Sequence, residues 1–384
     1  MHTDDYDGSG SGGDGRQAVP RTGTDARTGA GAGADARTDA GTGPELVVRG
    51  HGHGHGQGLG LGQGQVVLVT GATGTVGGEV VRALPARLPA GLGVRVMARD
   101  PARAAAMFPG VEAVAGDYTD PPSLASALRG VRTAFLVTAR VEGDDDAAFV
   151  SAARAAGVRR VVKLSAAAVL DPGADDLITR RQRAGEETLR GCGLEWTLLR
   201  PRAFMSNSLS WAASVRRERT VRALYGSAPN ACVDPRDIAE VAARALTEEG
   251  HAGHAYTLTG PQALTAVEQT RALSRLLGIP LRFEELTLSQ ARTALAARFP
   301  PPLVEALLAS AERQRAGAKA HVDDTVHTLT GHPARTFHDW ARDHIEAFTP
   351  APDPTLAPAP DATSDPVATS TSAPAGTGTS RHTP

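Results

Sequence analysis

The fold can be predicted outward from one stretch of the sequence, which reads Gln65-Val66-Val67-Leu68-Val69-Thr70-Gly71-Ala72-Thr73-Gly74-Thr75-Val76-Gly77-Gly78. Its run of apolar residues before Thr70 is typical of a short strand that is buried on both faces of a parallel sheet. Of the glycines that follow, Gly71 permits a tight turn and Gly74 lets the backbone approach a pyrophosphate, while Gly77 lets the next helix pack closely. The stretch therefore predicts a dinucleotide-binding turn, and the alternative is a glycine-rich strand-to-helix turn that binds nothing.

Composition separates a central folded part from two terminal segments. Residues 1–64 hold 19 of the 43 glycines and almost no large apolar residues, so we predict that they are disordered. Residues 350–384 consist mainly of Pro, Ala, Ser and Thr, and we expect the same of them. The part that can bury a core is 65–349.

Within this part, strand and helix patterns alternate up to about residue 200. Expected strands are 66–70, 93–98, 111–114, 133–138, 161–165 and 196–201, with helices from 75, 101 and 121 and at 144–156 and 181–190. Such alternation predicts an α/β fold with a doubly wound, parallel Rossmann sheet over 65–200.

Residues 201–349 have a looser pattern. Helices are expected at 234–246, 265–277, 289–297, 302–313 and 337–348, and strands at 256–258 and 281–286. We expect this half to form a smaller, mostly helical substrate or lid region over the crevice at the carboxyl ends of the strands.

The bulk properties exclude several classes of protein. The acidic N-terminus has no signal-peptide pattern, and no apolar run reaches the ~20 residues that span a bilayer. The net charge of −2 argues against nucleic acid as the main partner, and two cysteines give no metal or disulfide framework. We therefore predict a cytoplasmic protein that does not engage membranes. The run His51, His53, His55 is interpreted as low-complexity sequence and not as a metal site.

Arg99 follows the second expected strand, where the adenosine ribose of a dinucleotide lies in such folds. An acid at this position suits the 2′-hydroxyl of NAD, whereas an arginine suits the 2′-phosphate of NADP. The sequence therefore favours NADP(H) over NAD(H). Asp100 is explained as a helix cap, and a solvated surface role is the alternative for Arg99.

Polar residues also follow the next three strands. Asp117, with Tyr118 beside it, is placed to accept a hydrogen bond from adenine, although a turn aspartate that caps its own backbone is an equal alternative. Thr138 ends the fourth strand beside the expected cofactor path, and Ser165 ends the fifth.

At this point a family resemblance is clear, and it covers 65–349. The chain resembles the NmrA-like branch of the atypical short-chain dehydrogenases/reductases. The matching motifs are Val69 to Gly77, Val96 to Pro101, Gly116-Asp117-Tyr118, Val162 to Ser165, Leu198 to Asn207, Val233 to Ala239 and Tyr256 to Pro261.

The resemblance implies NAD(P)H binding, usually NADPH, and a substrate pocket closed by the C-terminal half. The residues expected around the cofactor are Gly71, Thr73, Gly74, Thr75, Val76, Gly77, Arg99, Asp117, Tyr118 and Thr138. The loop from Pro201 to Asn207 is implied to lie near the nicotinamide, with Pro201, Phe204, Met205 and Asn207 lining the substrate pocket.

The chain departs from the wider superfamily in one respect. Those enzymes use a tyrosine and a lysine four residues later, and the lysine lowers the phenol pKa. No tyrosine in this sequence is followed by lysine at that spacing. Ser165 matches the position of the superfamily's catalytic serine, but without these partners it is only a weak candidate, and a serine that bonds its neighbours is the alternative.

Three functions remain open. The first is an NADPH-dependent oxidoreductase that transfers hydride to a small conjugated acceptor such as a quinone or dye, with the proton taken from water. The second is a non-catalytic NAD(P)H sensor that binds a protein partner. The third, an isomerase or epimerase, needs an acid/base pair that the sequence does not show. We favour the reductase.

Overall fold

The computed structural model describes residues 66–140 and 143–350. The two terminal segments predicted to be disordered, and His51, His53 and His55 with them, lie outside the described residues, apart from Pro350.

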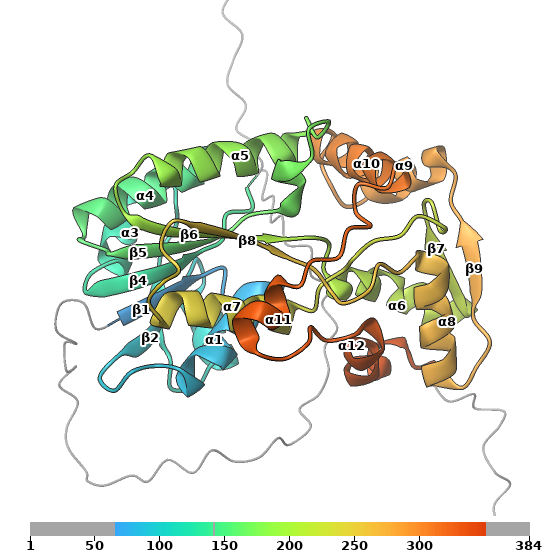
Figure 1. Cartoon of the computed structure of the whole chain (residues 1–384), viewed down its shortest axis with the longest axis horizontal. Coiled ribbons are helices and arrows are strands. Elements are labelled where there is room, and N and C mark those ends of the chain that lie inside the picture. The colour runs from blue at the N-terminus through green and yellow to red at the C-terminus, as the bar shows by residue number, and fades with distance from the viewer. Residues whose placement is uncertain (1–65, 141–142, 351–384) are drawn as a thin grey trace, which may run out of the picture.

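Seven parallel strands form one sheet in the order β3-β2-β1-β4-β5-β6-β8 (Figure 1). The strands are β1 (Val66–Thr70), β2 (Gly93–Ala98), β3 (Glu112–Ala115), β4 (Val131–Leu136), β5 (Arg160–Leu164), β6 (Glu195–Pro201) and β8 (His254–Leu258). The order reverses between β1 and β4, and in such sheets ligands bind outside the carboxyl ends of the strands at this switch point. All five residues of β1 are buried, as a strand covered on both faces requires.

Helices cover both faces of the sheet. One face carries α1 (Thr75–Ala83), α2 (Pro101–Met107), α7 (Pro235–Thr247) and α11 (Thr325–Thr330), and the other carries α3 (Pro121–Ala127), α4 (Asp145–Ala155) and α5 (Leu177–Arg190) (Figure 1). The predicted doubly wound Rossmann architecture is therefore confirmed. None of the helices in the described ranges has the length and apolar character needed to cross a membrane.

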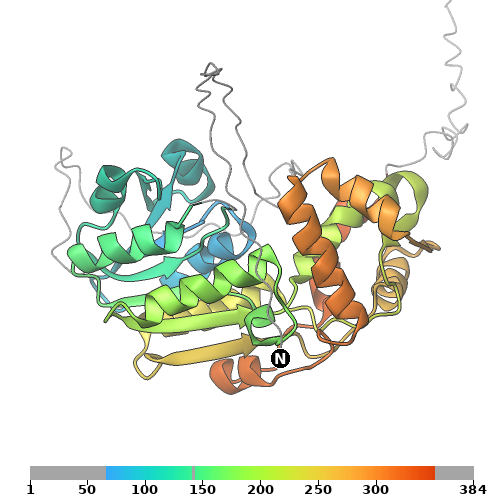
Figure 2. The ribbon, with the colours of Figure 1, turned by 90° about the horizontal axis from the view of Figure 1, so that it is seen from above.

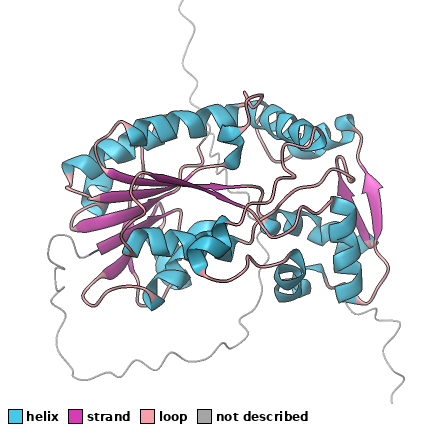
Figure 3. Ribbon diagram, viewed as in Figure 1, coloured by secondary structure: helices cyan, strands magenta, loops and turns pink. Residues whose placement is uncertain are grey.

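The remaining elements gather beyond the carboxyl ends of the strands (Figures 2 and 3). They are α6 (Ala212–Glu218), α8 (Ala266–Leu277), α9 (Leu288–Ala296), α10 (Pro301–Arg315), α12 (Phe337–Asp343), β7 (Thr220–Ala223) and β9 (Arg282–Glu285), with short 3₁₀ helices at Ala167–Leu170, Met205–Trp211 and Ile345–Phe348. A further 3₁₀ helix, Leu84–Ala86, directly extends α1 and is not part of this group. This region has its own apolar cluster around Trp340, which is 1% exposed. The expected helical C-terminal region is thus present.

Several boundaries differ from the sequence prediction for local reasons. Helix α5 begins at Leu177, four residues before the expected start, because the Asp176 side chain accepts a hydrogen bond from Thr179 N at 3.1 Å and caps it. The helix expected over 337–348 is interrupted at His344, whose backbone is not helical. The strand predicted at 281–286 is β9, and its partner β7 was not predicted.

Candidate active site

The glycine turn after β1 has the close packing that its sequence predicts. Gly71 adopts a φ of +64°, which side chains rarely tolerate, and a Cβ there would lie 2.9 Å from Cβ of Val137. A Cβ on Gly77 would lie 2.2 Å from the carbonyl oxygen of Gly71. Neither Gly71 nor Gly77 has room for a side chain, so the first turn of α1 packs directly on the loop backbone.

The same turn presents unpaired backbone donors. Gly74 is the N-cap of α1, and no side chain from the described residues caps the helix; its first turn contains no acid. Gly71, Thr73, Gly74 and Thr75 are exposed, whereas Val76 and Gly77 are buried beneath them. Free N–H groups at the positive end of a helix dipole bind phosphate oxygens well. The residues present therefore fit the pyrophosphate of a dinucleotide.

The ends of β2 and β3 provide charge beside this turn. Arg99 is exposed, and the adjacent Asp100 accepts a hydrogen bond from Arg103 N at 3.0 Å, so Asp100 caps α2 as expected. Hydrogen bonds from Thr119 hold the pKa of Asp117 below its ordinary value, and the charges of Arg140 and Arg99 add to this effect. Arg99 and Asp117 thus lie within electrostatic reach of each other.

Asp117 combines both roles considered for it. Its Oδ1 accepts hydrogen bonds from Thr119 N at 2.8 Å and Thr119 Oγ1 at 2.7 Å, which is the self-capping turn. The Asp117 side chain is nevertheless 37% exposed, so a ligand can reach it. Its contact with adenine stays a prediction.

Tyr118 points its hydroxyl into the protein. The hydroxyl donates to the carbonyl oxygen of Val137 at 2.8 Å, and the ring lies edge-on to Phe149. Burial raises the tyrosine's pKa well above its ordinary value. Tyr118 therefore ties the loop after β3 to the end of β4, and its part in cofactor binding also stays a prediction.

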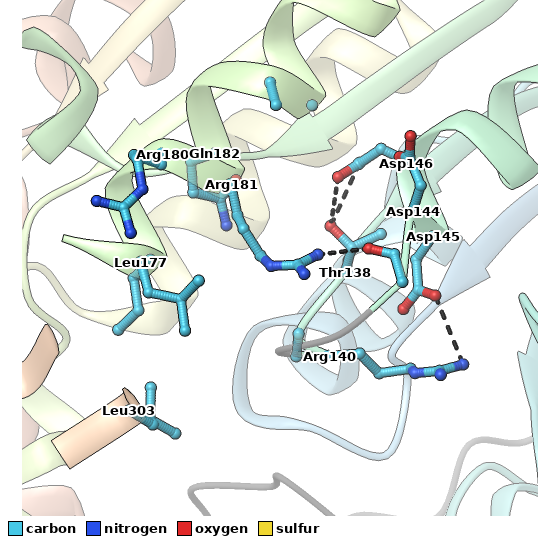
Figure 4. Close-up of a pocket in the computed structure, with 15 residues that line it drawn as sticks. Thr138, Arg140, Asp144, Asp145, Asp146, Leu177, Arg180, Arg181, Gln182 and Leu303 are labelled. Carbon is cyan, nitrogen blue, oxygen red and sulfur yellow. Dashed lines mark hydrogen bonds and ion pairs between the residues drawn. The ribbon is translucent and has the colours of Figure 1, made fainter. Parts of the chain in front are cut away.

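Thr138 belongs to a buried charged group that the sequence did not reveal. Lys163, on β5 and fully buried, donates from Nζ to Asp146 Oδ1 at 2.8 Å and to Thr138 Oγ1 at 3.1 Å. Thr138 in turn donates to Asp146 Oδ2 at 3.1 Å (Figure 4). Gly185 of α5 makes room for this arrangement, because a Cβ there would lie 2.5 Å from Asp146 Oδ2.

A first cavity of about 440 Å³ lies over this group. It is bounded by the segment after β4, the start of α5 and Leu303 of α10 (Figure 4). Arg181 extends across the cavity and donates from Nη1 to the carbonyl oxygen of Gly143. Arg140 Nη1 lies 3.6 Å from Oδ1 of Asp145.

Ser165 is held by a carboxylate. Its Oγ donates to Glu186 Oε1 at 2.6 Å, and Arg200 donates to both oxygens of Glu186 at 2.9 and 2.6 Å. Burial by itself would raise the pKa of Glu186, but the hydrogen bonds from Arg200 and Ser165 outweigh it, so this pKa lies below its ordinary value. The geometry suits the bonded serine that was the alternative to a catalytic one.

The loop after β6 separates the predicted pocket residues. Pro201 and Met205 are buried, and Phe204 pairs with Val233 in an isolated bridge. Asn207 is exposed and lines a second cavity of about 440 Å³ together with Thr75 of α1. The apolar walls of this cavity include Leu295, Phe299, Leu307 and Trp340. Thr75, which is predicted to hold the cofactor, and Asn207, which is predicted to line the substrate pocket, therefore line the same cavity.

No group of three or more metal-ligating side chains occurs within 66–140 and 143–350. The groups missed by sequence analysis, Lys163 and Asp146 and the pair Glu186 and Arg200, give no local signal. Lys163 stands in an apolar strand, and its partner lies on a helix 17 residues earlier.

Comparison with known proteins agrees with this geometry. A family model described as NAD(P)H-binding matches residues 71–249. The (4-alkanoyl-5-oxo-2,5-dihydrofuran-3-yl)methyl phosphate reductase of Streptomyces griseus is 57% identical over 285 residues, which cover 74% of this chain and 100% of the relative.

Two further proteins extend the comparison. The NAD(P)H azoreductase of Xenophilus azovorans is 38% identical over 288 residues, covering 74% of this chain and 99% of its own length. The NADPH-dependent quinone oxidoreductase of Escherichia coli, a solved structure, superposes with a TM-score of 0.63 at 27% identity, covering 73% of this chain and 99% of that one.

Proposed function

Because the chain belongs to the NmrA-like branch of the atypical short-chain dehydrogenases/reductases, an NAD(P)H-binding family of oxidoreductases, we propose that it is an NADPH-dependent reductase of a phosphorylated butenolide. The observation that carries this proposal is the identity with the Streptomyces griseus reductase, which extends over the whole of that relative. The acceptor would be an alkanoyl-substituted unsaturated lactone with a phosphomonoester on its side arm.

The chemistry of such an acceptor suits a site without a Tyr-x-x-x-Lys pair. Its ring double bond is conjugated with both the lactone carbonyl and the alkanoyl carbonyl. When bound, the reduced nicotinamide supplies the hydride, which adds to the ring carbon that bears the phosphomethyl arm. The electron pair moves to the adjacent ring carbon, where both carbonyls delocalise it, and water supplies the proton. Since the resulting enolate is well stabilised, the reaction needs no strong acid from the protein.

In this proposal the protein binds the cofactor and the acceptor and orients them for hydride transfer. The glycine turn and the N-terminus of α1 hold the pyrophosphate, and Arg99 holds the 2′-phosphate, which favours NADP(H) over NAD(H). Asp100 does not compete for the ribose in this assignment, because its carboxylate caps α2.

Residues 201–349 act in the proposal as the substrate and lid region. Asn207 and the apolar walls formed by Leu295, Phe299 and Leu307 make the second cavity suitable for an alkanoyl chain. Closing apolar side chains over the acceptor also excludes bulk water from the nicotinamide and fixes the distance for hydride transfer.

The test uses the full chain and follows nicotinamide absorbance with NADPH or NADH. The acceptors are an alkanoyl butenolide phosphate, a quinone and an azo dye. We expect NADPH-dependent reduction with the butenolide phosphate as the best acceptor. Gly74→Asp should abolish turnover in folded protein, because its side chain fills the space through which the turn backbone approaches the pyrophosphate and its charge adds repulsion. Gly74→Asn, which matches Asp in size but carries no charge, should retain slightly more.

Two outcomes oppose the proposal. If a quinone or dye is reduced much faster than the butenolide phosphate, the acceptor class is wrong. If NADPH binds tightly but no acceptor is reduced, the non-catalytic sensor becomes the better account.

A further inference from the structure

Three cationic side chains, Arg202, Arg313 and Lys319, lie near one another beyond the end of β6. Arg202 directly follows the last residue of β6, Arg313 lies in the last turns of α10, and Lys319 follows that helix. The charges of Arg313, Arg202 and Asp171 all act on Lys319, which places the four side chains near one another. The segment that carries Lys319 is fixed in place, because its carbonyl oxygen accepts a hydrogen bond from Ala231 N at 2.9 Å.

The cluster has more positive than negative charge. Arg202 Nη1 lies 3.2 Å from Oδ1 of Asp171, and Arg313 Nη2 lies 2.8 Å from Oδ2 of Asp176. Lys319 has no ion pair within the described part of the chain, and its Nζ donates to Ser310 Oγ at 2.8 Å. Two carboxylates therefore face three cations.

The two arginines also keep unused hydrogen-bond donors. Their side chains are only 10% and 14% exposed. The Nε atoms of Arg202 and Arg313 are buried without a hydrogen-bond partner among the described residues. Because a buried donor without a partner lowers stability, native structures contain few of them. An anion with several acceptor oxygens would satisfy these donors.

The position of the cluster fits the proposed acceptor. Arg202 adjoins Pro201, where the loop expected near the nicotinamide begins. Along α10, Leu307 and Ser310 are three residues apart, so they lie on neighbouring positions of one helix face. Leu307 lines the apolar second cavity, and Ser310 bonds the Lys319 ammonium. One helix thus offers an apolar surface and a cationic one about one turn apart.

We infer that Arg202, Arg313 and Lys319 form the binding seat for the phosphomonoester of the acceptor. This inference rests on the proposed function, because it names the part of the site that recognises the phosphorylated substrate. Asp171 and Asp176 hold the two arginines in place, and Lys319 supplies the unpaired charge. With the phosphate bound here, the alkanoyl chain extends toward Leu307 and the lactone ring lies near the loop after Pro201.

The test compares the butenolide phosphate with its dephosphorylated alcohol as acceptors. In the wild type, kcat/KM should favour the phosphate ester. Lys319→Met should reduce this preference roughly 10- to 100-fold, which is the effect of losing one charge-assisted contact. Lys319→Arg should restore much of it. The matched control is Arg315→Leu, since Arg315 lies on the same helix but is 63% exposed and pairs with Glu312.

A binding measurement separates this inference from the proposed function. Phenyl phosphate is titrated by calorimetry into the NADP⁺-loaded full chain and into its Lys319→Met variant. If neither butenolide is reduced, the proposed function fails, but phenyl phosphate binding that Lys319→Met abolishes still supports the seat. A wild type that does not bind phenyl phosphate overturns the seat. So does a Lys319→Met variant with the full preference for the phosphate ester.

Discussion

The hydroxyl of Ser165 donates a hydrogen bond to Oε1 of Glu186 across 2.6 Å, and both side chains are buried. The hydroxyl proton of Ser165 therefore points at a structural carboxylate. We expect Ser165→Ala to reduce kcat/KM by about threefold or less, because a hydroxyl held this way is not a proton donor. A true general acid would contribute about 100-fold or more, so a loss of that size in steady-state assays would make Ser165 catalytic.

Glu186 itself should matter for stability. Replacing it by glutamine leaves Arg200, whose side chain is 13% exposed, without its counter-charge. Removing one partner of a buried ion pair destabilises by about 3–5 kcal/mol, and we expect Glu186→Gln to do so in urea unfolding. Because the pKa of Glu186 lies below its ordinary value, this stabilisation is present at neutral pH and is lost as the pH falls below about 4.

The neighbouring Glu187 is the control for this measurement. It is exposed on the same helix, so Glu187→Gln should change the unfolding free energy by less than about 0.5 kcal/mol. If both substitutions change the free energy of unfolding equally, the buried ion pair between Glu186 and Arg200 does not stabilise the protein as argued.

Gly77→Ala should weaken cofactor binding. The new Cβ would lie 2.2 Å from the carbonyl oxygen of Gly71, which is backbone and cannot rotate away. Overpacking of this kind costs about 1–3 kcal/mol, so we expect NADPH affinity to fall roughly 5- to 150-fold in a fluorescence titration. In Gly191→Ala the nearest contact is an ordinary 3.4 Å, and NADPH affinity should not change. Unchanged affinity in Gly77→Ala would mean that the turn can relax.

Arg99→Ser should reduce discrimination between the two cofactors. Losing charge-assisted hydrogen bonds to a 2′-phosphate should weaken NADPH binding by about 1.5–3 kcal/mol and leave NADH binding nearly unchanged. Arg132→Ser is the control, because Arg132 is exposed at the start of β4, away from the carboxyl edge of the sheet. Equal wild-type affinities for NADPH and NADH would show that Arg99 does not select the cofactor.

The sheet and its flanking helices followed from the sequence because their signals are local. The apolar run of β1, the glycines after it and the capping aspartates Asp100 and Asp234 each specify one boundary within a few residues. β7 was missed because its four residues, Thr220–Ala223, gain their stability by pairing with β9, which lies about 60 residues later.

The site was predictable only in part for the same reason. Glycine spacing predicted a cofactor turn, and the structure has the close backbone packing that this spacing requires, because the signal comes from one short segment. Lys163 and Lys319 carried no such signal. Each depends on groups from distant elements, with Asp146 facing Lys163 and Arg202 acting on Lys319. Only the fold brings these charges together.

Lys319 gives the last prediction, which concerns pH. Burial, followed by the charges of Arg313 and Arg202, lowers the pKa of Lys319 to about 8, while Asp171 and Cys232 act in the opposite direction. A phosphomonoester gains its second charge near pH ~6. The affinity for the phosphorylated acceptor should therefore rise as the pH passes about 6, and it should fall above about 8, where Lys319 loses its proton.

The measurement is KM for the phosphorylated acceptor from pH 5 to 10, and the dephosphorylated alcohol serves as the reference. Lys319→Met should remove the loss of affinity on the alkaline side. Lys319→Arg should remove it too, but with high affinity retained, because arginine stays charged throughout this range. If Lys319 has only a structural role, KM should rise equally for both acceptors at alkaline pH. That result would refute the role of Lys319 in phosphate binding, because only an ammonium in contact with the phosphate can make the alkaline rise in KM specific to the phosphorylated acceptor.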